Sequence, residues 1–93
     1  MDYAFEWDER KRLANRAKHR LDFSDVARFG WTEAAVLPDT RKDYAEPRFI
    51  GYGWLDDRLC VVVFTDRGSI RRIISFRKAN RREQAAYHSR TAR

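Results

Sequence analysis

The sequence has few of the residues that bind metals, form disulfides or act as catalytic nucleophiles. It contains one cysteine, Cys60, and two histidines, His19 and His88, among 93 residues. A single cysteine cannot form a disulfide within the chain, and these three side chains lack the spacing of a metal site. No glycine-rich phosphate loop and no serine nucleophile motif is present. We therefore expect no cofactor and no metal, and we expect Cys60 to be a buried small apolar residue.

Long apolar runs are also missing. No stretch reaches the roughly 18 apolar residues of a membrane span, and residues 1–6 have neither the basic nor the apolar region of a signal peptide. Six Phe, three Trp and four Tyr must supply most of the core, because each large ring removes much apolar area from water. We expect one small domain over residues 1–93 that acts in the cytoplasm without a membrane.

Acidic residues are almost absent from the last third of the chain. Residues 67–93 contain nine Lys or Arg and a single acid, Glu83, whereas residues 1–66 contain 11 basic and 13 acidic residues. The net charge of +6 is therefore a local feature. A basic block of this kind attracts polyanions, most often nucleic acid. The alternative is a solvated basic face without a specific partner.

The first third of the chain has helical periodicity after a short extended start at residues 3–7. Asp8 is a suitable N-cap for a helix that ends at about Arg20. Apolar residues recur on one side of this helix, and we expect this stripe to face the core: Leu13, Ala14, Ala17 and Leu21. A second, short helix is expected after Asp22 or Ser24, with these residues on one face: Phe23, Val26, Ala27 and Trp31.

From residue 34 the apolar pattern changes to period two, which is typical of strands. Strands are predicted at residues 34–37, 48–55, 58–65 and 70–77, with a loop at 40–47 and turns at 56–57 and 66–69. Asn80 and Glu83 match a capping box at the start of a last helix. The order predicts an α+β fold with a short N-terminal strand, two helices, an antiparallel meander of about four strands and a C-terminal helix.

The strand at residues 70–77 carries several candidate site residues. Strict alternation places Arg71 and Arg77 on one face and Arg72 on the other. Arg72, between two isoleucines, is expected either to pair with an acid or to line a cleft. Arg77 lies before the last helix, where it can follow a phosphate chain together with neighbouring basic residues: Lys78, Arg81 and Arg82. The alternative for these neighbours is a solvated helix surface.

Few side chains can transfer a proton. Lys18 and His19 end the first helix, where they either complement its C-terminus or contact phosphate and exchange a proton. Tyr87 and His88 are further candidates, although core packing is the better interpretation of Tyr87. Aromatic residues that can stack on the bases of a single-stranded nucleic acid are also available, although strand aromatics mostly belong to the core: Tyr44, Phe49, Tyr52 and Trp54.

The chain resembles the BrnT family of bacterial type II toxins, a branch of the RelE-like ribonuclease superfamily. In the first half the resemblance rests on Phe5-Glu6-Trp7-Asp8 followed by Lys11, Asn15, Lys18-His19 and Phe23. In the second half it rests on residues 72–79, Arg82-Glu83 and Tyr87. The chain has Phe76 where this family usually has a small residue, and Arg71 where it usually has an aliphatic one.

The resemblance implies a RelE-like fold and metal-independent endonucleolytic cleavage of RNA that halts translation. It also implies a BrnA-like, DNA-binding antitoxin that forms a hetero-oligomer with the toxin and carries it to operator DNA. We take Arg77, Arg72, His19 and Lys18 as candidate catalytic residues. The candidate RNA-binding residues are Arg67, Arg71, Lys78, Arg81 and Arg82.

The antitoxin is expected to bring acidic residues to a groove ringed by the basic block: Arg71, Arg72, Arg77, Lys78, Arg81 and Arg82. Two other functions fit the same residues. One is a nucleic-acid-binding module without catalysis, and the other is a protein-interaction domain whose basic face meets an acidic partner.

Overall fold

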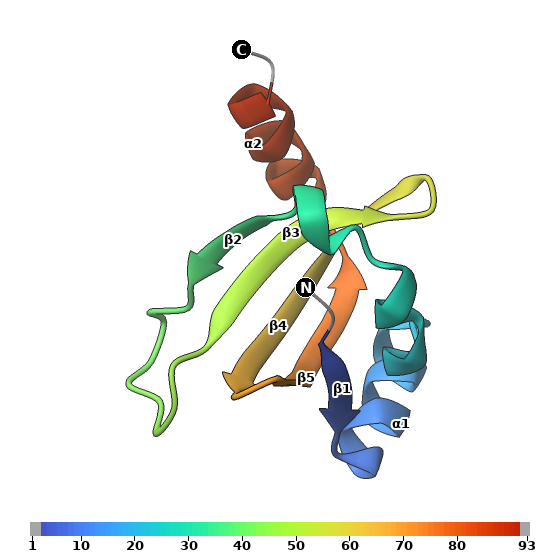
Figure 1. Cartoon of the computed structure of the whole chain (residues 1–93). Coiled ribbons are helices and arrows are strands. Elements are labelled where there is room, and N and C mark those ends of the chain that lie inside the picture. The colour runs from blue at the N-terminus through green and yellow to red at the C-terminus, as the bar shows by residue number, and fades with distance from the viewer. Residues whose placement is uncertain (1–2, 92–93) are drawn as a thin grey trace.

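A mixed five-stranded sheet forms the centre of the protein. The computed structural model describes residues 3–91. Across the sheet the order is β1 (Ala4–Trp7), β5 (Ile70–Lys78), β4 (Arg58–Arg67), β3 (Phe49–Leu55) and β2 (Ala35–Pro38), as Figure 1 shows. The strands β2 to β5 form the predicted antiparallel meander, and β1 pairs parallel to β5. The predicted α+β class is confirmed.

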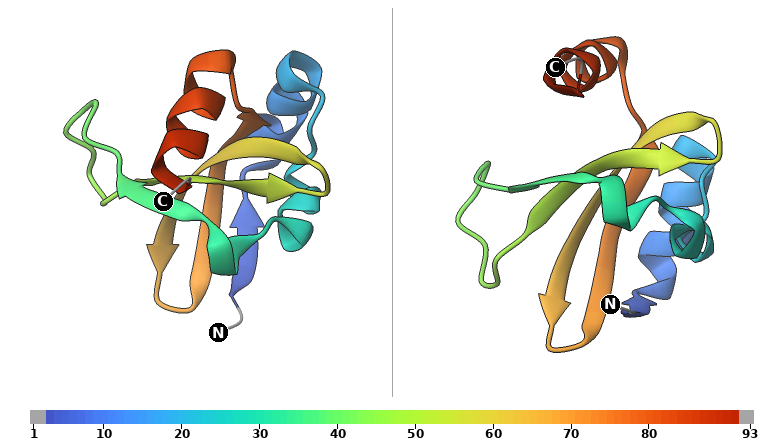
Figure 2. Two further views of the ribbon diagram at one scale, coloured as in Figure 1. Left: turned by 90° about the horizontal axis from the view of Figure 1, so that it is seen from above. Right: turned by 45° about the horizontal axis from the view of Figure 1, so that its top comes forward.

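Two α-helices flank this sheet, and both begin at the predicted caps. In α1 (Glu9–His19) the side chain of Asp8 accepts a hydrogen bond from the Lys11 backbone N–H. In α2 (Arg81–Thr91) the side chains of Asn80 and Glu83 each accept from the other residue's backbone N–H. In the left view of Figure 2, α2 lies between α1 and the loop that connects β2 to β3, and in the right view it stands above the sheet.

The predicted second helix starts at the expected cap, Asp22, but two 3-10 turns take the place of an α-helix. These are η1 (Phe23–Arg28) and η2 (Trp31–Glu33). Between them the Gly30 N–H donates to the Trp54 carbonyl oxygen, and Phe29 forms an isolated bridge with Leu55. These backbone bonds to β3 interrupt a continuous helix. The turn of the last hairpin is also shorter than predicted, since β4 runs to Arg67 and β5 begins at Ile70.

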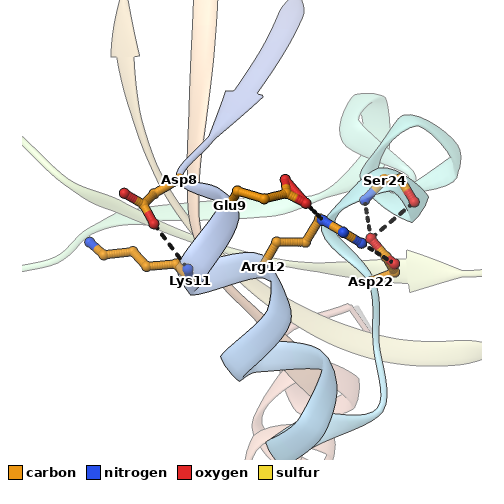
Figure 3. Close-up of polar contacts among 6 residues, drawn as sticks. All are labelled: Asp8, Glu9, Lys11, Arg12, Asp22 and Ser24. Atoms are coloured by element: carbon orange, nitrogen blue, oxygen red, sulfur yellow. Dashed lines mark hydrogen bonds and ion pairs between the residues drawn. The ribbon is translucent and has the colours of Figure 1, made fainter.

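An ion pair joins α1 to the N-cap of η1. Arg12 pairs with Glu9 and also reaches Asp22, which caps η1 (Figure 3). The second carboxylate oxygen of Asp22 accepts from the backbone N–H and the hydroxyl of Ser24. The Ser24 backbone bond is the largest cause of a lowered pKa at Asp22. The network fixes the direction of the chain as it leaves α1.

The sheet buries apolar side chains on both faces, but unequally. On the side covered by η1 and η2, here called the aromatic face, the core contains Phe23, Val26, Phe29, Leu55, Cys60, Val62, Phe64, Ile73 and Phe76. On the opposite side a smaller cluster contains Leu59, Val61 and Ala79, with Tyr52, Trp54 and Tyr87 packed against it. Cys60 is fully buried, as expected, and burial raises the pKa of its thiol.

Helix α1 meets the edge of the sheet through a polar residue. Asn15 is the one buried residue of α1. Its side-chain amide donates to the Phe76 carbonyl oxygen at 2.7 Å, and its oxygen accepts from the Phe76 N–H at 3.1 Å. Strand β1 pairs with β5 only as far as Ile73. At Phe76, therefore, Asn15 takes the hydrogen-bonding place of a neighbouring strand.

The predicted apolar stripe of α1 is wrong for three of its four residues. Leu13 is 52% exposed, and Ala14 and Ala17 are exposed as well. Only Leu21, beyond the helix, packs against the core. The reason is that α1 lies against the backbone edge of a strand, which requires hydrogen-bonding groups instead of aliphatic ones.

A β-bulge in β5 breaks the alternation that the sequence predicts. Val63 pairs with Ser75 but Phe64 pairs with Ile73, so Ile74 is an extra residue. As a result Ile73 and Phe76, three residues apart, both lie in the core of the aromatic face. Arg72 and Arg77 consequently share the opposite face, here called the basic face. The prediction that they lie on different faces is wrong, because a bulge shifts the alternation by one residue.

The contact between Asn15 and Phe76 predicts a large effect of a small substitution. Asn15→Ala should lower the free energy of unfolding by roughly 2–4 kcal/mol, because it leaves a buried N–H and a buried carbonyl without partners. Leu13→Ala, in the same helix, should change it by less than about 0.5 kcal/mol. Urea unfolding of both variants provides the test. A larger loss for Leu13→Ala than for Asn15→Ala would contradict this account of α1.

Candidate nucleic-acid interface

A small pocket on the basic face collects four cations from different parts of the chain. Its volume is about 150 Å³, and its basic residues are Lys11 of α1, Arg48 before β3, Arg67 of β4 and Arg72 of β5. The Arg48 guanidinium lies 4.1 Å above the ring centre of Tyr44, which also lines the pocket. The combination of cations and an aromatic ring suits a phosphate with a neighbouring base. We call it the basic pocket.

Two of these cations are already paired with carboxylates. Arg67 makes two bonds to Glu46, at 2.8 and 2.6 Å, and Arg72 bonds to Glu6. Both interpretations of Arg72 therefore hold, since it pairs with an acid and lines a cleft. Within residues 3–91, Lys11 and Arg48 form no ion pair. They are the pocket's cations that a phosphate can reach without displacing a carboxylate.

A second cationic cluster lies at the other end of β5. Arg77 bonds to both carboxylate oxygens of Glu83, at 2.7 and 2.8 Å. This pair raises the pKa of Arg77 and lowers that of Glu83. The His19 pKa is lowered, first by burial and then by the positive charges of Lys18 and Arg77. The structure therefore brings Arg77, Lys18 and His19 into one electrostatic neighbourhood.

The lowered pKa of His19 bears on its two alternative roles. A cation that complements a helix C-terminus would have a raised pKa. Here burial and the neighbouring cations lower the His19 pKa, which favours the neutral imidazole, the form that can accept a proton. Arg77 and Arg72 are five residues apart in β5, roughly 16 Å along a strand. An extended polyanion can contact both ends of the basic face.

Arg71 is not part of this face. Its guanidinium bonds to Asp66 at 2.7 and 2.9 Å and lies 3.8–4.6 Å from the ring centres of Tyr3, Trp31 and Phe64. Only 12% of its side chain is exposed. The structure therefore separates Arg71 from Arg72 and places it in the packing of the aromatic face.

The other predicted residues spread over the junction of β5 with α2. Lys78, Arg81 and Arg82 are exposed there. Tyr87 packs edge-on against Trp54, with ring centres 6.1 Å apart, and His88 lies 6.2 Å from the same ring. Tyr87 thus belongs to the smaller cluster of the sheet, as its apolar character suggested.

Of the four aromatic stacking candidates, only Tyr44 lines the basic pocket. Phe49 stacks on Phe64 on the aromatic face, while Tyr52 and Trp54 pack on the smaller cluster. Two basic residues of the pocket, Lys11 and Arg48, were missing from the predicted site. The sequence could have indicated Lys11, because it belongs to the family motif of the first half. For Arg48 the sequence shows only that it stands next to a predicted strand.

Within residues 3–91, no group of three or more His, Cys, Asp or Glu side chains is arranged to hold a metal ion. In the same range no helix has the length and apolar character to cross a membrane.

A comparison with known protein families found a match that covers most of the basic face. The family model described as the ribonuclease toxin BrnT of type II toxin-antitoxin systems matches residues 7–83. No curated protein matches the chain. The matched region runs from the end of β1 to the first turn of α2, and it includes both cationic ends of the basic face. The chain belongs to the BrnT family of ribonuclease toxins, and such a toxin has a cognate antitoxin as its partner.

Proposed function

We propose that the basic face binds single-stranded RNA and cleaves it without a metal ion. The observation that supports this most strongly is the bulge at Ile74, which puts Arg72 and Arg77 on one face. Around them lie cations from four segments, with His19 at one end. A backbone that carries many phosphates can contact such a surface at several points, so binding should weaken as salt rises.

The proposed reaction is attack of a ribose 2′-OH on the adjacent phosphate. Neutral His19 accepts the 2′-OH proton while the 2′ oxygen bonds to phosphorus. The bond from phosphorus to the 5′ oxygen breaks, and Lys18 donates a proton to that leaving oxygen. The products are a 2′,3′-cyclic phosphate and a 5′-OH. Arg77 stabilises the negative charge that develops on the phosphate in the transition state.

The basic pocket would hold RNA away from the cleaved bond. Lys11 and Arg48 contact a phosphate, and the Arg48–Tyr44 pair offers a flat surface on which a base can stack. In the cell, we propose that cleavage occurs in the cytoplasm and stops translation. The antitoxin would bind the toxin in a hetero-oligomer, and operator DNA would be reached only through the antitoxin.

Production of the chain without its antitoxin should arrest bacterial growth, fragment RNA and stop incorporation of labelled amino acids. With purified protein, 10 mM EDTA, on the order of a hundredfold above trace metal, should leave cleavage unchanged, because the mechanism uses cations of the chain. Growth with intact RNA at good expression would reject the enzyme, and loss of activity in EDTA would reject the metal-free reaction.

Arg77→Ala should lower kcat/KM for RNA cleavage on the order of 10²-fold or more, because it removes a group that stabilises transition-state charge. Arg77→Lys should restore only part of the activity, because an ammonium ion cannot reproduce the two-pronged guanidinium. Single-turnover cleavage assays measure both.

Two control variants distinguish the loss of the Arg77 charge from a loss of stability. Glu83→Gln breaks the ion pair of Arg77 but keeps the α2 capping box, and it should retain activity. Arg28→Ala removes an exposed arginine that pairs with Asp25 and Asp56 outside the basic face, and it should behave as the unsubstituted protein does. Full activity of Arg77→Ala with an unchanged Tm would refute the assignment.

The cleavage rate should fall in acid, with a midpoint below the ordinary histidine pKa of about 6.5, because His19 must be neutral and its pKa is lowered. His19→Gln should lower the rate roughly 10²-fold or more and remove this acid limb, whereas His88→Gln should keep it. A pH–rate profile for each protein makes the comparison.

The same shift has a consequence for folding. Because the folded state lowers the His19 pKa, the unfolded chain binds more protons below pH 6.5 or so, and stability should rise with pH through that window. His19→Gln should lose this dependence. If His19 only completes the helix, the variant should keep its turnover and lose up to about 1 kcal/mol of stability.

A further inference from the structure

A groove with largely apolar walls lies between the edge strand β2 and helix α2. Its volume is about 250 Å³. Ala35 and Leu37 of β2 line one side, Ala86 and Tyr87 of α2 line the other, and Arg82 and Arg90 also face it. None of the basic-pocket residues lines it. Apolar side chains make up most of the facing walls and two arginines stand beside them, so this groove suits a ligand with both apolar and acidic groups, unlike the basic pocket.

Strand β2 is an exposed apolar edge of the sheet. It has only β3 as a neighbour. Two consecutive residues at its centre, Val36 and Leu37, are 43% and 42% exposed. An edge strand with free backbone groups and apolar side chains promotes association with other chains. Natural proteins usually cover such an edge. Here α2 lies along one side of the groove, and Val36 and Leu37 of the edge strand stay exposed.

Helix α2 is itself incompletely packed. Among residues 81–90 only Glu83 and Tyr87 are partly buried, and the other eight are exposed. An eleven-residue helix is shorter than the roughly 12–15 residues at which isolated helices become even marginally stable. A segment that fills the groove would bury side chains of β2 and α2 together and would hold α2 against the sheet.

Charge identifies the kind of segment. Within residues 3–91, Arg82 and Arg90 form no ion pair with an acidic side chain. Protein interfaces combine an apolar centre with a polar rim, and aromatic and arginine side chains are enriched in them. The complementary ligand therefore has apolar side chains directed into the groove and carboxylates next to them.

We propose that the antitoxin neutralises this chain by docking an acidic, amphipathic segment into the groove between β2 and α2, an inference that rests on the proposed function. Glu83 lines the groove and holds Arg77 through both carboxylate oxygens. A segment in the groove therefore lies next to the proposed catalytic arginine and blocks RNA there. Of the six basic residues predicted from the sequence to ring the antitoxin groove, only Arg82 lines this one, and Arg71 lies on the other face of the sheet.

Leu37→Glu and Ala86→Glu test the docking site. The probe is the purified cognate antitoxin, and its Kd is measured by calorimetry. Each substitution should raise Kd at least tenfold and leave RNA cleavage unchanged, so that the variants cleave RNA at antitoxin concentrations that silence the unsubstituted protein. Leu13→Glu, at the comparably exposed leucine of α1, is the matched control and should bind normally.

Arg90→Glu tests the charge of the segment. It should slow association with the antitoxin severalfold at low salt and reduce the salt dependence of the association rate, because opposite charges steer the encounter. Arg16→Glu, at an exposed arginine of α1, is the matched control. Unchanged association of Arg90→Glu would overturn the acidic character of the segment.

The outcomes separate this proposal from the enzymatic one. If the unsubstituted chain binds antitoxin but does not cleave RNA, the proposed function fails while the calorimetric test of the groove remains valid. If Leu37→Glu and Ala86→Glu bind antitoxin with unchanged Kd, the groove is not the docking site and the function stands. If the toxin alone forms a dimer that Leu37→Glu dissociates, the occupant is a second copy and the proposal is overturned.

Discussion

The paired hydrogen bonds between the Asn15 side chain and the Phe76 backbone are the constraint on which the site depends. β1 protects the edge of β5 only as far as Ile73, so the rest of that edge needs partners from elsewhere. An amide side chain supplies a donor and an acceptor at once, as a strand does. By doing so, α1 can lie against the edge, and its C-terminal Lys18 and His19 come close to Arg77.

The bulge at Ile74 and the Asn15 contact act together. The bulge adds one residue, so Phe76 turns into the core and Arg77 turns onto the basic face. The Asn15 bonds then fix the backbone of Phe76 directly before Arg77. Bulges commonly re-aim a side chain next to a functional site. In this chain Asn15 helps to direct Arg77, although it lies 61 positions before Phe76, the residue whose backbone it binds.

Local sequence patterns predicted most helices and strands correctly, but they often predicted the wrong face of an element for a given side chain. The caps at Asp8 and Asn80, the meander and the buried Cys60 follow from neighbouring residues alone. The interrupted second helix, the exposed Leu13 and the bulge depend on contacts between distant segments, which periodicity does not encode. The position of Arg48 in the basic pocket also depends on such distant contacts, because it is set by how the loop before β3 folds against the sheet. The family motif nevertheless contained Asn15 and Lys11, whose roles only the tertiary structure explains.

The basic face is less positive than its arginines suggest. Arg67, Arg72 and Arg77 each bond to a carboxylate, from Glu46, Glu6 and Glu83 respectively. These pairs hold the guanidinium groups in position in the free protein, so little side-chain entropy remains to be lost when a phosphate arrives. A phosphate must compete with a resident carboxylate, however, and the gain at each arginine is the difference between two charge-assisted bonds. In the proposed RNA complex the net attraction should therefore come mainly from the unpaired cations around them, and Lys11 and Arg48 should contribute more to affinity than their place outside the last strand would suggest.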